Sequence, residues 1–219
     1  MQHKFEAVVF DMDGILFDSE RLVIGCWQEV AQKHGISDVE KTCRKCLGVN
    51  AAGARAIFLD TYGQDFPYDV YKAEMSALYH SRYDNGRLPM KEGVEELLAY
   101  LQSRGKRIGL ASSTRSQVVF QELMDAGIAS YFDHIVGGDM VAKSKPEPDI
   151  FLKACEELGV LPEEAFAVED SYNGIRAASA GKLRPLMVPD LMPPTEEMHQ
   201  LAEGIFDSLK DVKRYLEAF

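Results

Sequence analysis

Two pairs of closely spaced acidic residues are the first candidates for chemistry in this chain. Asp11 and Asp13 stand in the segment DMDG, and Glu169 and Asp170 stand in the segment VEDS. If the four side chains shared one site, two carboxylates about 4 Å apart would repel each other by roughly 4 kcal/mol at an effective dielectric constant of 20. Such a site needs protons or a cation, and its hard oxygen donors suit Mg²⁺.

A lysine and a run of hydroxyl residues supply the complementary groups. Lys145 lies in the segment KSKP, and Ser112 and Ser113 lie in the segment ASST. A lysine is a point charge that suits a phosphate group, and serine hydroxyls can donate to its oxygens. Gly14 allows the turn after Asp11 to bend closely, so that backbone amides can also donate. A metal ion flanked by an acidic nucleophile and a lysine is what phosphoryl transfer needs.

The elements that must position these residues are short apolar runs separated by longer segments of helical periodicity. Alternation of strands and helices predicts an α/β protein with a mostly parallel sheet and helices on both faces. Ligands bind outside the carboxyl ends of the strands of such sheets, so we expect the acids, hydroxyls and lysine to meet at one edge. The predicted strands are Ala7–Phe10, Arg107–Ala111, His134–Val136, Ala165–Val168 and Pro185–Val188.

One long segment breaks this alternation. Residues 19–87 contain helical patterns and no convincing strand, which predicts a helical subdomain inserted after the first strand. Residues 19–88 carry nine basic and nine acidic side chains, whereas the remainder carries the whole net charge of −11. We therefore expect a catalytic core formed by residues 1–18 and 88–219, with residues 19–87 as the insertion. The alternative is that these helices pack directly on the sheet.

Composition limits the classes of function. The 219 residues have 46% hydrophobic and 27% charged side chains, which is typical of a globular protein. The net charge of −11 argues against nucleic acid and anionic membranes as partners. Four cysteines are too few for a disulfide scaffold, and we interpret Cys43 and Cys46 as two thiols one turn apart on a helix. With no signal peptide or membrane span in the sequence, we expect a cytoplasmic protein.

The motifs DMDGILFDSE, GLASST, KSKPEPDIF and AVEDSYNGI resemble, in this order and spacing, the four motifs of the haloacid dehalogenase superfamily. The resemblance is closest to the branch of beta-phosphoglucomutases and sugar-phosphate phosphatases. It implies a Rossmann-like, doubly wound core with a small helical cap inserted after the first strand. It also implies a small phosphorylated metabolite as the partner and Mg²⁺ as the cofactor.

The same resemblance implies roles for the residues at the motif positions. Asp11 would be the nucleophile that forms an aspartyl-phosphate, and Asp13 the general acid and then base. The implied phosphate-binding residues are Ser112, Ser113 and Lys145. The implied metal-binding residues are Asp11, Asp13 through its carbonyl, Asp170 and Glu169, the last as a direct ligand or as a neighbour of the ligands.

Two further residues are candidates for contact with the substrate. Arg115 stands where related enzymes place a basic residue that faces the substrate, and the alternative is a surface arginine. Asn173 could shape the loop beside Asp170 or cap the helix that follows.

The residues at a few positions favour hydrolysis of a phosphate ester over transfer of a phosphoryl group between two positions of a sugar. Asp13 indicates that the substrate is a phosphate ester, because family dehalogenases lack this aspartate. Beta-phosphoglucomutases carry a histidine on the first cap helix and an arginine in a cap loop, where this chain has Val23 and Ala51. We therefore predict a phosphatase. A phosphomutase is the alternative, with Arg55 as a possible substitute ligand, and a non-enzymatic binding protein is the third hypothesis.

Overall fold

The computed structural model describes residues 4–219, and the first three residues of the predicted core lie outside this range. Within residues 4–219, six strands form one sheet in the order β3-β2-β1-β4-β5-β6. All five strand pairs are parallel. The strands are β1 (Ala7–Phe10), β2 (Arg107–Ser112), β3 (His134–Gly137), β4 (Ala165–Glu169), β5 (Arg184–Met187) and β6 (Gly204–Ile205).

The predicted parallel sheet is thus confirmed, with small differences at its ends. The second, third and fourth strands each extend one residue further than predicted, and the fifth begins and ends one residue earlier. The sixth strand was not predicted, because two residues at a sheet edge give no periodicity to detect. The alternating side chains of β1 explain its central place, since Val8 and Phe10 face one apolar cluster and Ala7 and Val9 the other.

Helices cover both faces of the sheet, as the doubly wound prediction requires. One face packs against α5 (Val94–Ser103), α6 (Ser116–Asp125) and α10 (Leu209–Leu216). The other face packs against α7 (Asp149–Leu158) and α8 (Tyr172–Ala180), and α9 (Glu196–Leu201) lies beside α8 at the β5 end. Two short 3₁₀ turns, Ala129–Tyr131 and Pro162–Glu164, precede β3 and β4.

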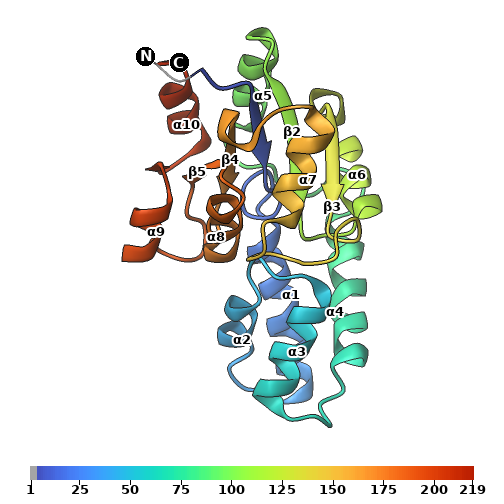
Figure 1. The fold of residues 1–219 in the computed structure, drawn as a ribbon. Coiled ribbons are helices and arrows are strands. Elements are labelled where there is room, and N and C mark those ends of the chain that lie inside the picture. Colours follow the sequence, from blue (N-terminus) through green and yellow to red (C-terminus); the bar gives the residue numbers. More distant parts are fainter. Residues whose placement is uncertain (1–3) are drawn as a thin grey trace.

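The inserted segment folds into four helices with an apolar core of its own, which contradicts the alternative that these helices pack on the sheet. We call it the cap; it contains α1 (Ser19–His34), α2 (Val39–Lys45), α3 (Ala51–Tyr62) and α4 (Tyr68–Tyr83). Trp27, Phe58 and Met75 are among its buried residues. Figure 1 shows the cap below the sheet, at the end towards which the β1 and β3 arrows point.

Two linkers that run side by side join the cap to the core. The amide of Asp18 donates to the carbonyl of Pro89 at 3.0 Å, and the amide of Lys91 donates to the carbonyl of Leu16 at 2.8 Å. These contacts lie close to the predicted boundaries, and we propose residues 19–87 as the cap domain on this basis. Within residues 4–219, none of the helices combines the length and the apolar character needed to cross a membrane.

Candidate active site

Three acidic residues meet at the carboxyl ends of the two central strands. Asp11 directly follows β1, Glu169 ends β4, and Asp170 follows it. Because β1 and β4 are paired neighbours in parallel register, these positions lie side by side, and the amide of Asp11 continues the pairing by donating to the carbonyl of Val168 at 2.9 Å. One carboxylate oxygen from each acid lies within 4.8 Å of the others. The structure therefore brings three of the four predicted acids together at the predicted edge.

Lys145 is buried among these acids. Its Nζ atom donates to Oδ1 of Asp11 and to Oε1 of Glu169, both at 2.6 Å, and to the carbonyl of Ala111 at 3.1 Å. Only 1% of the lysine side chain is exposed, so a lone ammonium here would carry a large desolvation cost. The two carboxylates offset that cost, and the lysine in turn keeps them close to each other.

Glu169 has both carboxylate oxygens engaged. Oε1 accepts from Lys145, while Oε2 accepts from the amide of Ser171 at 2.8 Å and from its hydroxyl at 2.9 Å. The Ser171 hydroxyl in turn caps α8 by accepting from the amide of Gly174 at 3.0 Å. A Cβ atom at position 174 would lie 1.7 Å from Oε1 of Glu169, so only glycine allows the helix to approach this carboxylate.

Burial shifts the ionisation of the cluster. The pKa of Asp11 is raised to about 8, chiefly by burial; the charge of Lys145 opposes the rise, and the charges of Glu169 and Asp13 add to it. Burial, together with Glu20 and Glu169, also raises the pKa of Asp170. Burial opposes the charged form of Lys145, but its ion pairs with Asp11 and Glu169 raise its pKa overall and keep it protonated. Two buried carboxyls with raised pKa values are oxygen donors that a divalent cation would hold in the ionised form.

The turn after Asp11 brings the second aspartate and the backbone close to the acids. Gly14 has φ = +82°, and a Cβ atom there would lie 2.4 Å from Oδ2 of Asp170. Asp13 Oδ1 accepts from the Ser19 hydroxyl at 2.6 Å, and its Oδ2 accepts from the Thr114 hydroxyl at 3.0 Å. Two neutral hydroxyls thus orient the Asp13 carboxyl from both of its oxygens.

Of the two predicted serines, one is buried at the edge of the sheet and the other lines a cavity between the core and the cap. Ser112 is completely buried; its hydroxyl accepts from the amide of Thr114 at 3.0 Å and lies 3.5 Å from Oδ2 of Asp13. Ser113 lines the cavity, and its hydroxyl lies 3.5 Å from the carbonyl of Gly48 in the cap. Their phosphate-binding roles remain predictions.

A cavity of about 410 Å³, which we call the cap–core pocket, joins these residues to the cap. Asp11 and Asp13 form its core side, and cap residues from α1 to α4 form the opposite wall. The apolar part of that wall includes Val23, Ile24, Trp27, Val49, Ala51, Ala54, Phe58, Tyr68, Met75 and Tyr79. The aromatic side chains of the cap thus serve both its core and the pocket.

The two candidate substrate residues lie in different places. Arg115 lines the cap–core pocket, and its side chain is exposed. Asn173 is outside the pocket lining, and its side-chain oxygen accepts from Arg176 at 3.3 Å. Contact with a substrate stays a prediction for both residues.

Several polar residues around the pocket were not predicted from the sequence. Lys72, Glu122 and Glu20 line it, and Thr114 contacts Asp13. Lys72 lies four residues after Tyr68 and three before Met75, so helical spacing places it on the pocket face of α4. Burial, followed by the charge of Asp13, raises the pKa of Glu122 to about 8, which makes it a proton-bearing group in the wall.

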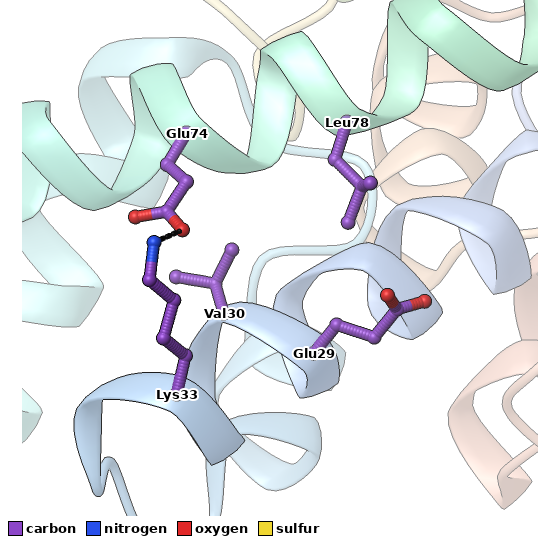
Figure 2. Close-up of a pocket in the computed structure, with 5 residues that line it drawn as sticks. All are labelled: Glu29, Val30, Lys33, Glu74 and Leu78. Atoms are coloured by element: carbon purple, nitrogen blue, oxygen red, sulfur yellow. Dashed lines mark hydrogen bonds and ion pairs between the residues drawn. The ribbon is translucent and has the colours of Figure 1, made fainter.

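A second cavity, of about 360 Å³, lies on the cap between α1 and α4 (Figure 2). Its charged groups already have partners, since Lys33 donates to Glu74 at 2.6 Å and Glu29 pairs with Arg82. It contains none of the motif residues and is not a candidate for the reaction.

The two cysteines of the C-x-x-C segment behave as predicted. Cys43 lies in α2 and Cys46 directly follows it, and both thiols are free. Burial raises the pKa of Cys43 to about 12 and that of Cys46 to about 11, so both remain protonated near neutral pH. Both cysteines pack in the apolar core of the cap.

Comparison with known proteins points to one family. The model of the haloacid dehalogenase-like hydrolases matches residues 8–188. A phosphorylated carbohydrates phosphatase of Thermotoga maritima is 30% identical over 97% of this chain and 91% of its own length. A CbbY variant from Rhodobacter sphaeroides in complex with xylulose-(1,5)bisphosphate has a TM-score of 0.78 and 29% identity, covering 94% of this chain and 95% of that chain. Beta-phosphoglucomutase of Clostridium difficile shares the fold, with a TM-score of 0.81, 24% identity, and coverage of 98% and 96%.

Proposed function

This chain belongs to the haloacid dehalogenase-like hydrolases and is a phosphatase of small phosphorylated metabolites, and we propose that its substrate is a sugar phosphate, hydrolysed with Mg²⁺ through an aspartyl-phosphate. The observation that carries this proposal is the buried cluster of Asp11, Glu169, Asp170 and Lys145, of which Asp11 lines the pocket between the core and the cap.

The proposed reaction has two steps that use the same pair of aspartates. In the first, an oxygen of Asp11 forms a bond to phosphorus while the bond from phosphorus to the sugar oxygen breaks, and Asp13 gives its proton to that oxygen. In the second, a water molecule attacks phosphorus, Asp13 takes its proton, and the bond between phosphorus and Asp11 breaks to release phosphate. The Ser19 and Thr114 hydroxyls keep the Asp13 carboxyl oriented through both steps.

Asp11, Asp170 and the carbonyl of Asp13 would hold the Mg²⁺, whose charge would offset that of the phosphoryl oxygens. The chemistry of the donor set fits this ion, because crowded carboxyls with raised pKa values gain most from a hard divalent cation. Since both oxygens of Glu169 already accept hydrogen bonds, we assign it to positioning Lys145 and Ser171.

Hydrolysis is favoured over a mutase reaction by the cap wall. Val23 and Ala51, at the positions where the mutase resemblance would require a histidine and an arginine, line the pocket and offer no charge. Arg55, the possible substitute, is absent from the lining and pairs with Asp69 at 3.2 Å. A mutase must hold a second phosphate during turnover, and this wall offers neither of those two ligands.

We expect the purified protein to release phosphate from members of a panel of sugar phosphates when Mg²⁺ is present, and to lose this activity in EDTA. The panel should include beta-glucose 1-phosphate, with glucose 6-phosphate and free phosphate measured in parallel. Release of phosphate that recovers when Mg²⁺ is restored supports the proposal. Conversion to glucose 6-phosphate faster than phosphate release would support the mutase instead, and activity unaffected by EDTA would contradict the role of the ion.

Lys72 is expected to set part of the substrate preference. Lys72 is half-buried in the pocket wall, and burial, together with the charge of Arg115, lowers its pKa. A half-buried cation of the pocket wall that has no ion pair within residues 4–219 favours an anionic or hydroxyl-rich part of the substrate. A hydrogen bond to a charged group contributes about 1.5–3 kcal/mol, so Lys72→Met should raise KM for the best substrate by roughly tenfold or more with a smaller change in kcat.

The control for that prediction is Lys33→Met, which removes an exposed lysine of the cap outside the pocket. Steady-state kinetics of both variants on the same substrate checks the prediction. Equal KM values for Lys72→Met and the parent protein would show that Lys72 does not contact the substrate.

A further inference from the structure

A second group of carboxylates lies next to the proposed metal site and shares one member with it. One oxygen each of Glu20, Asp170 and Asp190 lies within 4.8 Å of the others. The three come from different parts of the fold: Glu20 from the first turn of α1 in the cap, Asp170 from the end of β4, and Asp190 from the loop after β5. Glu20 and Asp190 play no part in the reaction steps proposed above.

Two oxygens of this group are buried without a hydrogen-bond partner. They are Oε2 of Glu20 and Oδ2 of Asp190, and both are shielded from solvent. The Asp190 side chain is only 3% exposed. A buried acceptor without a donor costs about 1–3 kcal/mol, and a charged one costs more, so these atoms call for a donor that the protein itself does not supply.

The surroundings of Asp190 argue against direct coordination of a second cation. Its Oδ1 atom accepts from Lys91 at 2.8 Å and from Arg21 at 3.0 Å, so two cations already balance its charge. These bonds fix the carboxylate and leave Oδ2 as its only free oxygen. Glu20 lies beside Asp170 with one oxygen of each within 4.8 Å, and burial followed by the charge of Asp13 raises the pKa of Glu20. The group is therefore better suited to accept hydrogen bonds than to coordinate a second cation directly.

Mg²⁺ keeps several water molecules when it binds to proteins, and each bound water directs its hydrogens outward. We propose that Glu20 and Asp190 accept hydrogen bonds from the waters of a Mg²⁺ held by Asp11 and Asp170, and so fix the position of the ion. This inference rests on the proposed function, because it requires the metal. Since Glu20 belongs to the cap and Asp190 to the core, the waters would also tie the cap to the occupied site.

Isothermal titration calorimetry with Mg²⁺ alone, without substrate, tests whether Glu20 and Asp190 position the ion. The parent protein should bind one ion, and both Glu20→Gln and Asp190→Asn should weaken its binding by roughly tenfold, the lower end of the effect typical for residues that orient metal ligands. Asp60→Asn should leave the affinity unchanged, because Asp60 is an exposed carboxylate of the cap away from this group. Melting curves in EDTA would verify that each variant is folded.

The outcomes separate the inference from the proposed function. If the parent binds one ion and both carboxyl variants bind it equally well, the inference is overturned and the proposed function stands. If the parent binds two ions and a variant loses one, Glu20 and Asp190 are direct ligands, which also overturns the inference. If the parent binds no Mg²⁺, the proposed function itself is wrong, and the inference is wrong with it.

Discussion

Asp11→Asn is expected to lower the rate of phosphate release by roughly 10⁴-fold or more. Losses of this size or larger are typical when the nucleophile of an enzyme is removed. The amide cannot form the acyl-phosphate bond, yet it has the shape of the carboxylate and can accept from Lys145. It also removes one negative charge from a crowded buried cluster. The variant should therefore fold normally and fail in chemistry. Steady-state phosphate release and thermal melting, measured side by side, check both parts.

Asp60→Asn is the matched control, because Asp60 is an exposed aspartate of the cap outside the pocket. It should retain the activity of the parent protein. An Asp11→Asn protein that melts normally and keeps more than a tenth of the parent activity would refute Asp11 as the nucleophile.

The second large effect is expected from Lys145→Met. Removing the lysine leaves Asp11 and Glu169 buried without their shared cation, and breaking a buried ion pair in this way typically costs about 3–5 kcal/mol. We expect the free energy of unfolding to fall by this amount in EDTA, measured by urea denaturation. Activity should also be lost, because Lys145 is the proposed phosphate ligand. Mg²⁺ should restore part of the stability by supplying charge to the same cluster.

Lys143→Met provides the comparison for Lys145. The Lys143 side chain is 66% exposed, and its nearest acid, Glu147, lies 3.9 Å away. Changes of exposed side chains usually alter stability by about 0.5 kcal/mol or less. If Lys145→Met were as stable in EDTA as Lys143→Met, the buried acids would not depend on the lysine for their charge balance.

Much of the fold and of the acidic cluster could be predicted because both follow from local patterns. Apolar runs predict the strands, and the polar residues that follow each run are predicted to lie at one edge of a parallel sheet. That rule placed Asp11 and Asp170 together, although they are far apart in the sequence. The inserted helices could be predicted from the same alternation, by the absence of strands over a long segment.

The remaining parts depend on tertiary contacts that no local pattern records. Asp190 also follows a predicted strand, so the same rule extended to Pro185–Val188 would have named it. Lys72 carries only a weak signal, its helical spacing from Tyr68 and Met75, because that spacing does not reveal which face of α4 lines a pocket. Glu169 shows a further limit, since neither its ion pair with Lys145 nor the close approach of Gly174 in α8 leaves a local pattern in the sequence.

Chemical trapping of the phosphorylated protein tests the proposed nucleophile most directly. The protein would be mixed with Mg²⁺ and the best substrate of the panel, quenched in acid, reduced with borohydride and digested for mass spectrometry. Borohydride reduces an acyl phosphate to an alcohol, so an aspartyl-phosphate becomes homoserine. We predict homoserine at position 11 and nowhere else, and none in the absence of substrate. Homoserine at position 13 or 170, or active turnover with no reduced aspartate, would contradict the assignment of Asp11.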